Sequence, residues 1–391
     1  MSHAVYLILF VFSLGISLLV TARAVRLAER WGFIDSPGER KVHDRPKPRL
    51  GGLGVCAGFF LTLFAALLAA YFAPLALLPD SPASFLVHHR RGLEKEWLAL
   101  VGLVAGGAVI FAGGLLDDKR SLSPKGKLLW EISAAGIAIA AGFRLEFHQV
   151  LFKGVGLDLL ISVPVTLLWM LFLINAFNLL DNMDGLSAGV AAITTAFFAI
   201  YAHWQGEFFL AAAMTCLIGA LLGFLRFNWN PSRIFMGDGG ALLVGFLIAA
   251  FTCRCTYYRM SMTPGSILSL LLAGETLETR QGLLSLLTPL VIMAVPIFDT
   301  ASVVFIRWRS GKPLMQGDKN HFSHRLVALG LSQPQAVIVI YLATTFTGLG
   351  ALVLQSASIT QAILVFLQVL SVFAMILLLE RPGHARRGEG K

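Results

Sequence analysis

The stretch LDLLISVPVTLLWMLFLINAFNLLDNMDG, residues 157–185, starts with an apolar run long enough to cross a lipid bilayer and ends in two acids. A spanning helix needs about 20 mostly apolar residues, and ten more such runs occur along the chain. The whole chain is 57% hydrophobic and 14% charged, whereas soluble globular proteins are about a quarter charged. We therefore expect an all-α polytopic integral membrane protein with about eleven transmembrane helices. The expected spans are Ala4–Ala22, Leu53–Phe72, Trp97–Leu116, Leu128–Phe143, Leu157–Ile174, Leu186–Tyr201, Phe208–Leu225, Gly239–Cys255, Leu283–Ile306, Gln335–Leu354 and Ile359–Leu379.

No linker or internal repeat divides the chain, so residues 1–380 are expected to form one transmembrane domain and residues 381–391 a short basic cytoplasmic tail. With the N-terminus outside, 23 of the 31 lysines and arginines lie in inside loops and 8 in outside loops. Cytoplasmic loops of membrane proteins carry the excess of Lys and Arg, so this orientation is favoured. The net charge of +9 is attributed to loops that face anionic lipid or phosphorylated substrates, and no nucleic-acid partner is expected.

The first polar motif, LLDDKRSLSPKGKLLWE (115–131), places Asp117 and Asp118 where the third span ends. Carboxylates at the C-terminal end of a helix oppose its dipole, so a helix-capping role is not expected. Two interpretations stay open. The acids either pair with the adjacent basic residues or hold a cation or phosphate-bound magnesium, with Lys125 and Lys127 as anion contacts.

The second motif, NAFNLLDNMDGLSAG (175–189), follows the fifth span. Asn178, Asp181 and Asp184 are spaced i, i+3, i+6, which puts them on one face if the helix continues. Acids at a membrane boundary are costly without a cation or ligand. The alternative is a helix–turn–helix with polar caps.

The third motif, NWNPSRIFMGDGGALL (228–243), follows the seventh span and surrounds Asp238 with three glycines. Glycines there allow backbone N–H groups to approach a phosphate. A Gly-rich turn with Asp238 as the N-cap of the next helix is the alternative.

The fourth motif, GDKNHFSHRL (317–326), puts His321 and His324 on one helix face with Arg325 beside them. Two histidines next to cations suit phosphate recognition better than zinc, which would need a third ligand. A solvated basic loop is the alternative. Asp299 lies about two turns inside the ninth span and is a functional candidate, because acids inside a membrane are costly. All four motifs follow odd-numbered spans, so they fall on the same side of the membrane.

In combination, six motifs from about Asp35 to Leu326 resemble the polyprenyl-phosphate N-acetylhexosamine-1-phosphate transferases, glycosyltransferase family 4. They are RKVHDRPKPRLGG, LLDDKRSLSPKGKL, NAFNLLDNMDGL, NPSRIFMGDGG, VPIFDT and HFSHRL. The histidine motif resembles the undecaprenyl-phosphate GlcNAc-1-phosphate transferase branch, since it lacks the three consecutive histidines of the phospho-MurNAc-pentapeptide branch. Two departures bear on the sugar: Asn182 stands where the family usually has Gly, and HFSHR lacks the adjacent histidine pair of better-known members.

The resemblance implies transfer of a sugar 1-phosphate, GlcNAc-1-phosphate by default, from a UDP-sugar donor to a polyprenyl (undecaprenyl) phosphate acceptor, with release of UMP. It also implies Mg²⁺, with Mn²⁺ as a substitute, and an active site on the cytoplasmic face of a bacterial inner membrane. By motif it assigns Asn178 and Asp238 to the metal, Asp117, Asp118 and Asp181 to catalysis, and Lys127, Asp184, His321, His324 and Arg325 to the donor.

Other functions remain as alternatives. The sister enzyme that uses UDP-MurNAc-pentapeptide differs only in its donor. A transporter of anions or lipid-linked sugars would place polar groups near the bilayer midplane in two related halves, whereas the polar motifs here lie at span ends. A homodimer is left open by the sequence.

Overall fold

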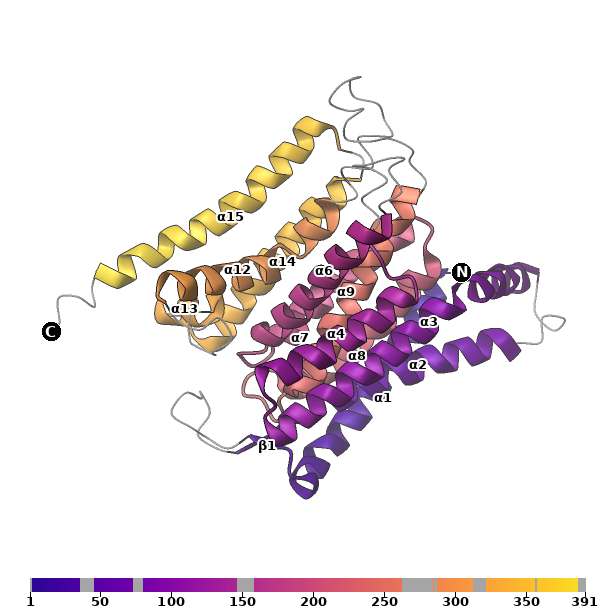
Figure 1. Cartoon of the computed structure of the whole chain (residues 1–391), viewed down its shortest axis with the longest axis horizontal. Helices are drawn as coiled ribbons and strands as arrows, with labels where there is room; N and C mark the ends of the chain where they lie inside the picture. The colour runs from indigo at the N-terminus through magenta and orange to yellow at the C-terminus, as the bar shows by residue number, and fades with distance from the viewer. Residues whose placement is uncertain are drawn as a thin grey trace.

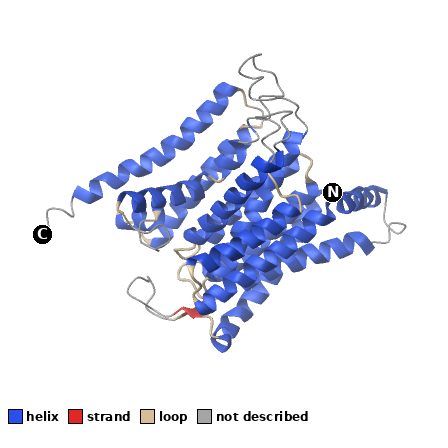
Figure 2. Cartoon of the chain, in the orientation of Figure 1, coloured by secondary structure: helices blue, strands red, loops and turns tan. Residues whose placement is uncertain are grey.

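A computed structural model describes residues 2–35, 46–72, 80–145, 158–261, 284, 287–311, 321–355 and 357–385. Within these ranges the chain is helical almost throughout, apart from one two-stranded antiparallel sheet (Figure 2). The sheet pairs β1 (Ile34–Asp35) with β2 (Lys47–Pro48). The helices are α1 Ser2–Trp31, α2 Gly52–Phe72, α3 Asp80–Arg120, α4 Pro124–Ala140, α6 Asp158–Leu180, α7 Leu186–Trp204, α8 Phe208–Asn228, α9 Gly237–Ser261, α12 Ala294–Arg309, α13 Phe322–Ala328, α14 Gln333–Val353 and α15 Ile359–Ala385.

Eight helical segments in the described part of the chain are long and apolar enough to cross a membrane. They are His3–Trp31, Gly52–Phe72, Glu96–Arg120, Leu159–Leu180, Leu186–Trp204, Phe208–Asn228, Gly237–Cys255 and Gln333–Val353. The other three expected spans overlap α4, α12 and the shorter apolar part of α15. The expected all-α multi-pass membrane architecture is therefore confirmed, while the total of eleven spans stays a prediction.

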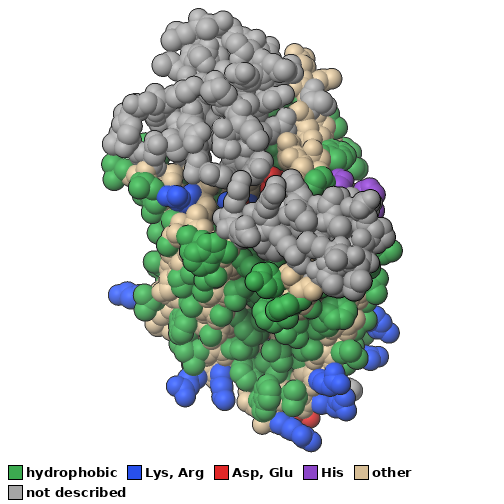
Figure 3. All heavy atoms as spheres, turned by 90° about the vertical axis from the view of Figure 1, so that its right-hand side faces the viewer, with side chains coloured by type: hydrophobic (Ala, Val, Ile, Leu, Met, Phe, Trp, Pro, Cys, Tyr) green, Lys and Arg blue, Asp and Glu red, His purple; other side chains and the backbone are tan. Residues whose placement is uncertain are grey.

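Helix α9 is the centre of the bundle. Within its apolar window 89% of the residues are buried, against 22% for α1, which lies at the periphery. α9 packs against α3, α6 and α2, and α8 packs against both α1 and α7 (Figure 1). On the face that Figure 3 shows, the described surface over the middle of the molecule is mainly apolar. Lys and Arg side chains gather there toward the lower end, which is the end at which Figure 1 labels β1. This distribution suits a protein that sits in a bilayer with one basic end.

Glycines allow the helices that carry the acidic motifs to touch at their ends. A Cβ built on Gly114 of α3 would lie 2.5 Å from the Cα of Gly239 on α9. A Cβ on Gly52 of α2 would lie 2.4 Å from the Cα of Gly240. Real Cβ atoms essentially never come within 3.0 Å of another heavy atom in this way. The backbones of α2 and α3 are therefore in direct contact with the first turn of α9.

We expect Gly114→Ala to lower the thermal stability of the protein in detergent. The added methyl group has no room unless α3 moves away from α9, and overpacking of this kind costs about 1–3 kcal/mol. Gly136→Ala is the matched control, because a Cβ on Gly136 of α4 meets nothing within 4 Å and alanine is the better helix former. The apparent melting temperature should fall for Gly114→Ala and stay level or rise for Gly136→Ala. Equal effects of the two substitutions would contradict the close approach.

Candidate active site

The segment between β2 and α2 places an arginine at the end of the helix bundle. The N–H of Phe235 donates to the carbonyl of Pro48 at 2.8 Å, and the N–H of Gly51 donates back to the carbonyl of Phe235 at 2.9 Å. The N–H of Arg49 donates to the carbonyl of Phe33, just before β1, at 2.9 Å. These backbone hydrogen bonds fix Arg49 beside the start of α9.

Asp118, at the end of α3, caps the first turn of α9. Its Oδ1 accepts the N–H of Asp238 at 2.9 Å and its Oδ2 accepts the N–H of Gly239 at 3.1 Å. The N-terminus of a helix has unpaired N–H groups and a partial positive charge, so a carboxylate is stabilising there. The expectation that the acids of this motif cap no helix is wrong for Asp118, because it opposes the dipole of its own helix but complements that of α9. Gly237, with φ of +76°, leaves room for this carboxylate, since a Cβ there would lie 2.7 Å from Asp118 Oδ2.

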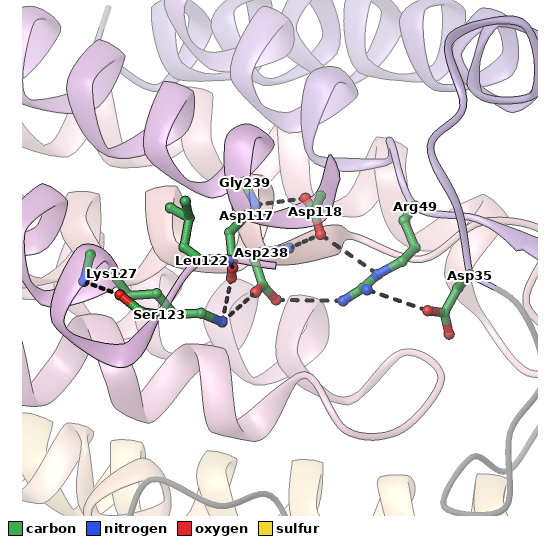
Figure 4. A network of polar contacts seen from close by, with 10 residues as sticks. Asp35, Arg49, Asp117, Asp118, Leu122, Ser123, Lys127, Asp238 and Gly239 are labelled. Carbon is green, nitrogen blue, oxygen red and sulfur yellow. Dashed lines mark hydrogen bonds and ion pairs between the residues drawn. The ribbon is translucent and has the colours of Figure 1, made fainter. Parts of the chain in front are cut away.

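Arg49 joins three carboxylates (Figure 4). Its Nε lies 3.6 Å from Asp118 Oδ1, its Nη2 lies 3.6 Å from Asp238 Oδ1, and its Nη1 lies 3.3 Å from Asp35 Oδ1. Burial acts to lower the pKa of Arg49, but attraction from Asp118, Asp238 and Asp35 raises it above the usual value. Arg49 is therefore a permanent positive charge within a group of acids.

Lys127, in the first turn of α4, joins the other side of the same group (Figure 4). Its Nζ forms an ion pair with Asp117 Oδ2 and lies 3.2 Å from Asp238 Oδ2. Asp117 Oδ1 also accepts the N–H of Leu122, in the turn between α3 and α4, at 2.7 Å. The side chain of Asp117 is 3% exposed, whereas that of Asp238 is 20% and that of Lys127 is 35% exposed. Asp117 thus supports the cluster from inside, and Asp238 and Lys127 face its open side.

Asn178 and Asp181, at the end of α6, are half-buried, and their side chains make no hydrogen bond or ion pair with another described residue. The pKa of Asp181 is raised from 3.8 to about 7, first by burial and then by repulsion from Asp238, with Arg49 acting in the opposite direction. Asp181 therefore lies close enough to the cluster to feel its charges, while its oxygens remain available to a ligand.

Asp184 does not share a helix face with Asn178 and Asp181 as the spacing predicts, because α6 ends at Leu180. It lies in the following turn, where its Oδ1 accepts from Ser232 Oγ at 2.7 Å and its Oδ2 accepts from the N–H of Ser232 at 3.0 Å. Lys47 Nζ is 3.6 Å from Oδ2. Asp184 thus ties the turn after α6 to the loop between α8 and α9, and its contact with a donor stays a prediction.

The histidine motif is held by the buried acid of α12. His321 Nδ1 lies 2.9 Å from Asp299 Oδ2, and Asp299 Oδ1 accepts the first N–H of α13 at 2.7 Å. Asp299 is 1% exposed, and these two contacts supply the hydrogen-bond partners that a carboxylate buried at that depth requires. Arg325 Nη2 donates to Ser302 Oγ, also on α12, at 2.9 Å. His324 is half-buried on the same short helix.

The structure thus brings most of the expected residues together in two groups. The first consists of residues at or directly after the ends of α3, α4, α6 and α9, namely Asp117, Asp118, Lys127, Asp181 and Asp238, with Asn178 in the last turn of α6. The second lies on or just before α13, namely His321, His324 and Arg325. A hydrogen bond from Ser323 to Asn182 joins α13 to the turn after α6. The binding and catalytic roles of these residues stay predictions.

The acids and the lysine of the first group lie in a part of the chain that matches a family model. Residues 100–256 match the model of glycosyl transferase family 4. The chain is 32% identical to the probable undecaprenyl-phosphate N-acetylglucosaminyl 1-phosphate transferase of Bacillus subtilis, over 94% of this chain and 90% of that protein. The chain belongs to glycosyl transferase family 4.

Two other relatives extend the comparison. The family 4 chain is 31% identical to the decaprenyl-phosphate N-acetylglucosaminephosphotransferase of Mycolicibacterium smegmatis, over 83% of this chain and 76% of that protein. It is 25% identical to the undecaprenyl-phosphate alpha-N-acetylglucosaminyl 1-phosphate transferase of Escherichia coli K12, over 90% of this chain and 84% of that protein. These matches confirm the resemblance inferred from the six motifs.

Two residues of this family 4 site, Arg49 and Lys47, receive no role from the sequence alone. Their motif, RKVHDRPKPRLGG, is one of the six that carry the family resemblance, but the sequence assigns no site role to its residues. The structure instead places Arg49 among Asp35, Asp118 and Asp238, and Lys47 beside Asp184. The sequence signal that could have identified Arg49 and Lys47 as site residues was the motif itself, which is basic, rich in proline and part of the family resemblance.

The oxygen-rich donor set at this site suits a hard divalent cation. Mg²⁺ prefers carboxylates and substrate phosphates as ligands. Asp238 lies on the open side of the cluster, and Asn178 and Asp181 have side-chain oxygens that no other described residue binds. Among the described residues no three His, Cys, Asp or Glu side chains form a ready-made metal cluster. Arg49 and Lys127 already form ion pairs with Asp35, Asp117, Asp118 and Asp238. The residues fit a cation that binds together with substrate phosphates better than one held by protein ligands alone.

Without divalent cations, we expect the stability of the protein to fall as the pH rises from about 5 to about 8. Because the pKa of Asp181 is raised from 3.8 to about 7, the folded protein holds a proton in this range that the unfolded chain has released. The stabilisation is lost as the pH passes through the folded value. Thermal unfolding in detergent at a series of pH values checks this.

Asp181→Asn should flatten the pH dependence. Glu29→Gln, which removes an exposed carboxylate of α1, is the matched control and should leave it unchanged. A wild-type pH dependence in Asp181→Asn would contradict the raised pKa.

Proposed function

We propose that this family 4 protein transfers GlcNAc-1-phosphate from UDP-GlcNAc to undecaprenyl phosphate, or to a similar polyprenyl phosphate, in a bacterial inner membrane. The observation that carries the proposal is the cluster formed by Arg49, Lys127, Asp117, Asp118 and Asp238 at one end of the membrane helices. The printed names of the three relatives support it, since each specifies N-acetylglucosamine and a polyprenyl phosphate.

The position of the cluster suits the two substrates. UDP-GlcNAc is soluble and anionic, so it must reach the site from water. The polyprenyl phosphate has its chain in the bilayer and its phosphate at the headgroup level, so the site must also lie at a membrane boundary. Helix ends at the basic end of a bundle meet both requirements, and the excess of Lys and Arg at that end supports a cytoplasmic orientation.

The reaction joins two anions, and the cations of the cluster oppose their repulsion. An oxygen of the acceptor phosphate attacks the phosphorus bonded to the sugar. The bond from that phosphorus to the bridging oxygen breaks, and UMP leaves with the bridging oxygen. Phosphoryl transfer depends mainly on positioning and charge stabilisation. Arg49 and Lys127 supply fixed positive charge at this point, and Asp117 and Asp118 hold them in place.

The acceptor needs little help from a general base. A phosphate monoester has a second pKa of about 6, so it is already mostly ionised at neutral pH. Mg²⁺, with Mn²⁺ as a substitute, would be held by Asn178, Asp181 and Asp238 and would neutralise charge on the phosphates. The histidines and Arg325, with Asp184, would hold the donor.

The purified protein should release UMP from UDP-GlcNAc in the presence of undecaprenyl phosphate. EDTA should abolish the release and Mg²⁺ should restore it. Asp238→Asn should lower kcat by about 100-fold at saturating Mg²⁺, the usual size of a lost charge-stabilising group, whereas Glu29→Gln should not. Near wild-type turnover of Asp238→Asn would contradict its role, and UMP release only from UDP-MurNAc-pentapeptide would contradict the donor.

Arg49→Lys should lower kcat by about 10- to 100-fold although it keeps the charge, because a lysine cannot reach three carboxylates at once with a planar fork. Arg226→Lys makes the same exchange at an exposed position in the last turn of α8 and should retain full turnover. Initial rates of UMP release at saturating substrates compare the two. Equal rates would show that Arg49 acts only through its charge.

A further inference from the structure

One pair of side chains joins the acid-bearing turn after α6 to the histidine-bearing helix α13. Ser323 Oγ donates to Asn182 Oδ1 at 2.6 Å, and Asn182 Nδ2 donates to the carbonyl of Leu179, in the last turn of α6, at 2.7 Å. Ser323 is 1% exposed. The amide of Asn182 therefore uses its nitrogen to hold its own helix end and its oxygen to hold α13.

Helix α13 is only seven residues long, so its placement depends on its partners. His321 Nδ1 and the N–H of Phe322 bind Asp299 of α12, and Ser323 binds Asn182. Three consecutive residues at the start of α13 are thus each bound to another element. Asp299 sets α13 against α12, and Asn182 sets it against the turn after α6.

The neighbours of Asn182 make this second contact relevant to the site. Asp181, directly before it, feels the charges of Asp238 and Arg49. Asp184, two residues after it, is bound to Ser232. The turn is therefore fixed to the loop that leads into α9, next to the acid cluster, and the bond to Ser323 links α13 to that position.

We infer that Asn182 and Ser323 form a positioning pair that sets the histidine motif against the acid cluster for the UDP-sugar donor. The inference rests on the proposed function, in which His321 and His324 hold that donor. Neither member of the pair needs to touch substrate, because both act through the residues next to them. Loss of the pair loosens the donor side of the site and leaves the acceptor side in place.

The test is a double-mutant cycle with Asn182→Ala, Ser323→Ala and the double variant. The KM for UDP-GlcNAc should rise by about 3- to 10-fold in each single variant, the range expected for one net hydrogen bond, and the KM for undecaprenyl phosphate should not change. The double variant should be no worse than the poorer single variant, because residues that act as a pair have non-additive effects. Ser371→Ala, which removes an exposed hydroxyl on α15, is the matched control.

A second comparison isolates the hydroxyl of Ser323 from the volume of its site. Thr and Val have the same shape, so Ser323→Thr should keep a lower KM for UDP-GlcNAc than Ser323→Val. Four outcomes would overturn the pair while the proposed function stands. They are an unchanged donor KM in the single variants, additive effects of the two substitutions, a rise in the acceptor KM alone, and an equal donor KM for the Thr and Val variants. If the wild-type protein releases no UMP from UDP-GlcNAc, the proposed function is wrong, and the positioning role of the pair, which rests on it, is wrong as well.

Discussion

The site depends on a carboxylate of one membrane helix that caps the N-terminus of another. Asp118 binds two N–H groups of α9, the helix whose apolar window is most buried, and it also pairs with Arg49. One side chain therefore fixes the end of α3, the start of α9 and the position of the arginine. Its side chain is only 1% exposed, and a buried carboxylate that lost these partners would be strongly destabilising. The three elements must accordingly assemble together.

Building a polar site at helix ends solves a problem that membranes impose. A charged group in the hydrocarbon core is costly, but helix ends carry unpaired backbone N–H and C=O groups that favour charge. The glycine contacts between α2, α3 and α9 bring three such ends within reach of one another. The acids gathered there exceed the cations, and the pKa of Asp181 is raised first by burial and then by repulsion from the other acids. A site of this kind favours the binding of a cation or the protonation of one of its acids.

Features with a strong local signal could be predicted from the sequence. The spans follow from long apolar runs, and the acidic motifs stand out because acids at span ends are unusual. The role of Arg49 could not be predicted, since it depends on backbone hydrogen bonds between segments far apart in the chain. The prediction that Asp184 shares a helix face with Asn178 was wrong, because the i, i+6 spacing assumes a continuous helix and α6 ends at Leu180. The capping by Asp118 was missed because the dipole argument considered only its own helix.

The two departures from the family pattern show what a sequence comparison leaves out. Asn182 and the HFSHR motif are far apart in the chain, so each alone suggests only doubt about the sugar. In the structure Asn182 accepts a hydrogen bond from Ser323 of that motif, so the departures form one contact. A glycine at position 182 would have no side chain to accept this bond, and the serine would then be a buried hydroxyl in need of another partner. The two positions are therefore physically dependent on each other, and the place of α13 in the site is a property of the pair.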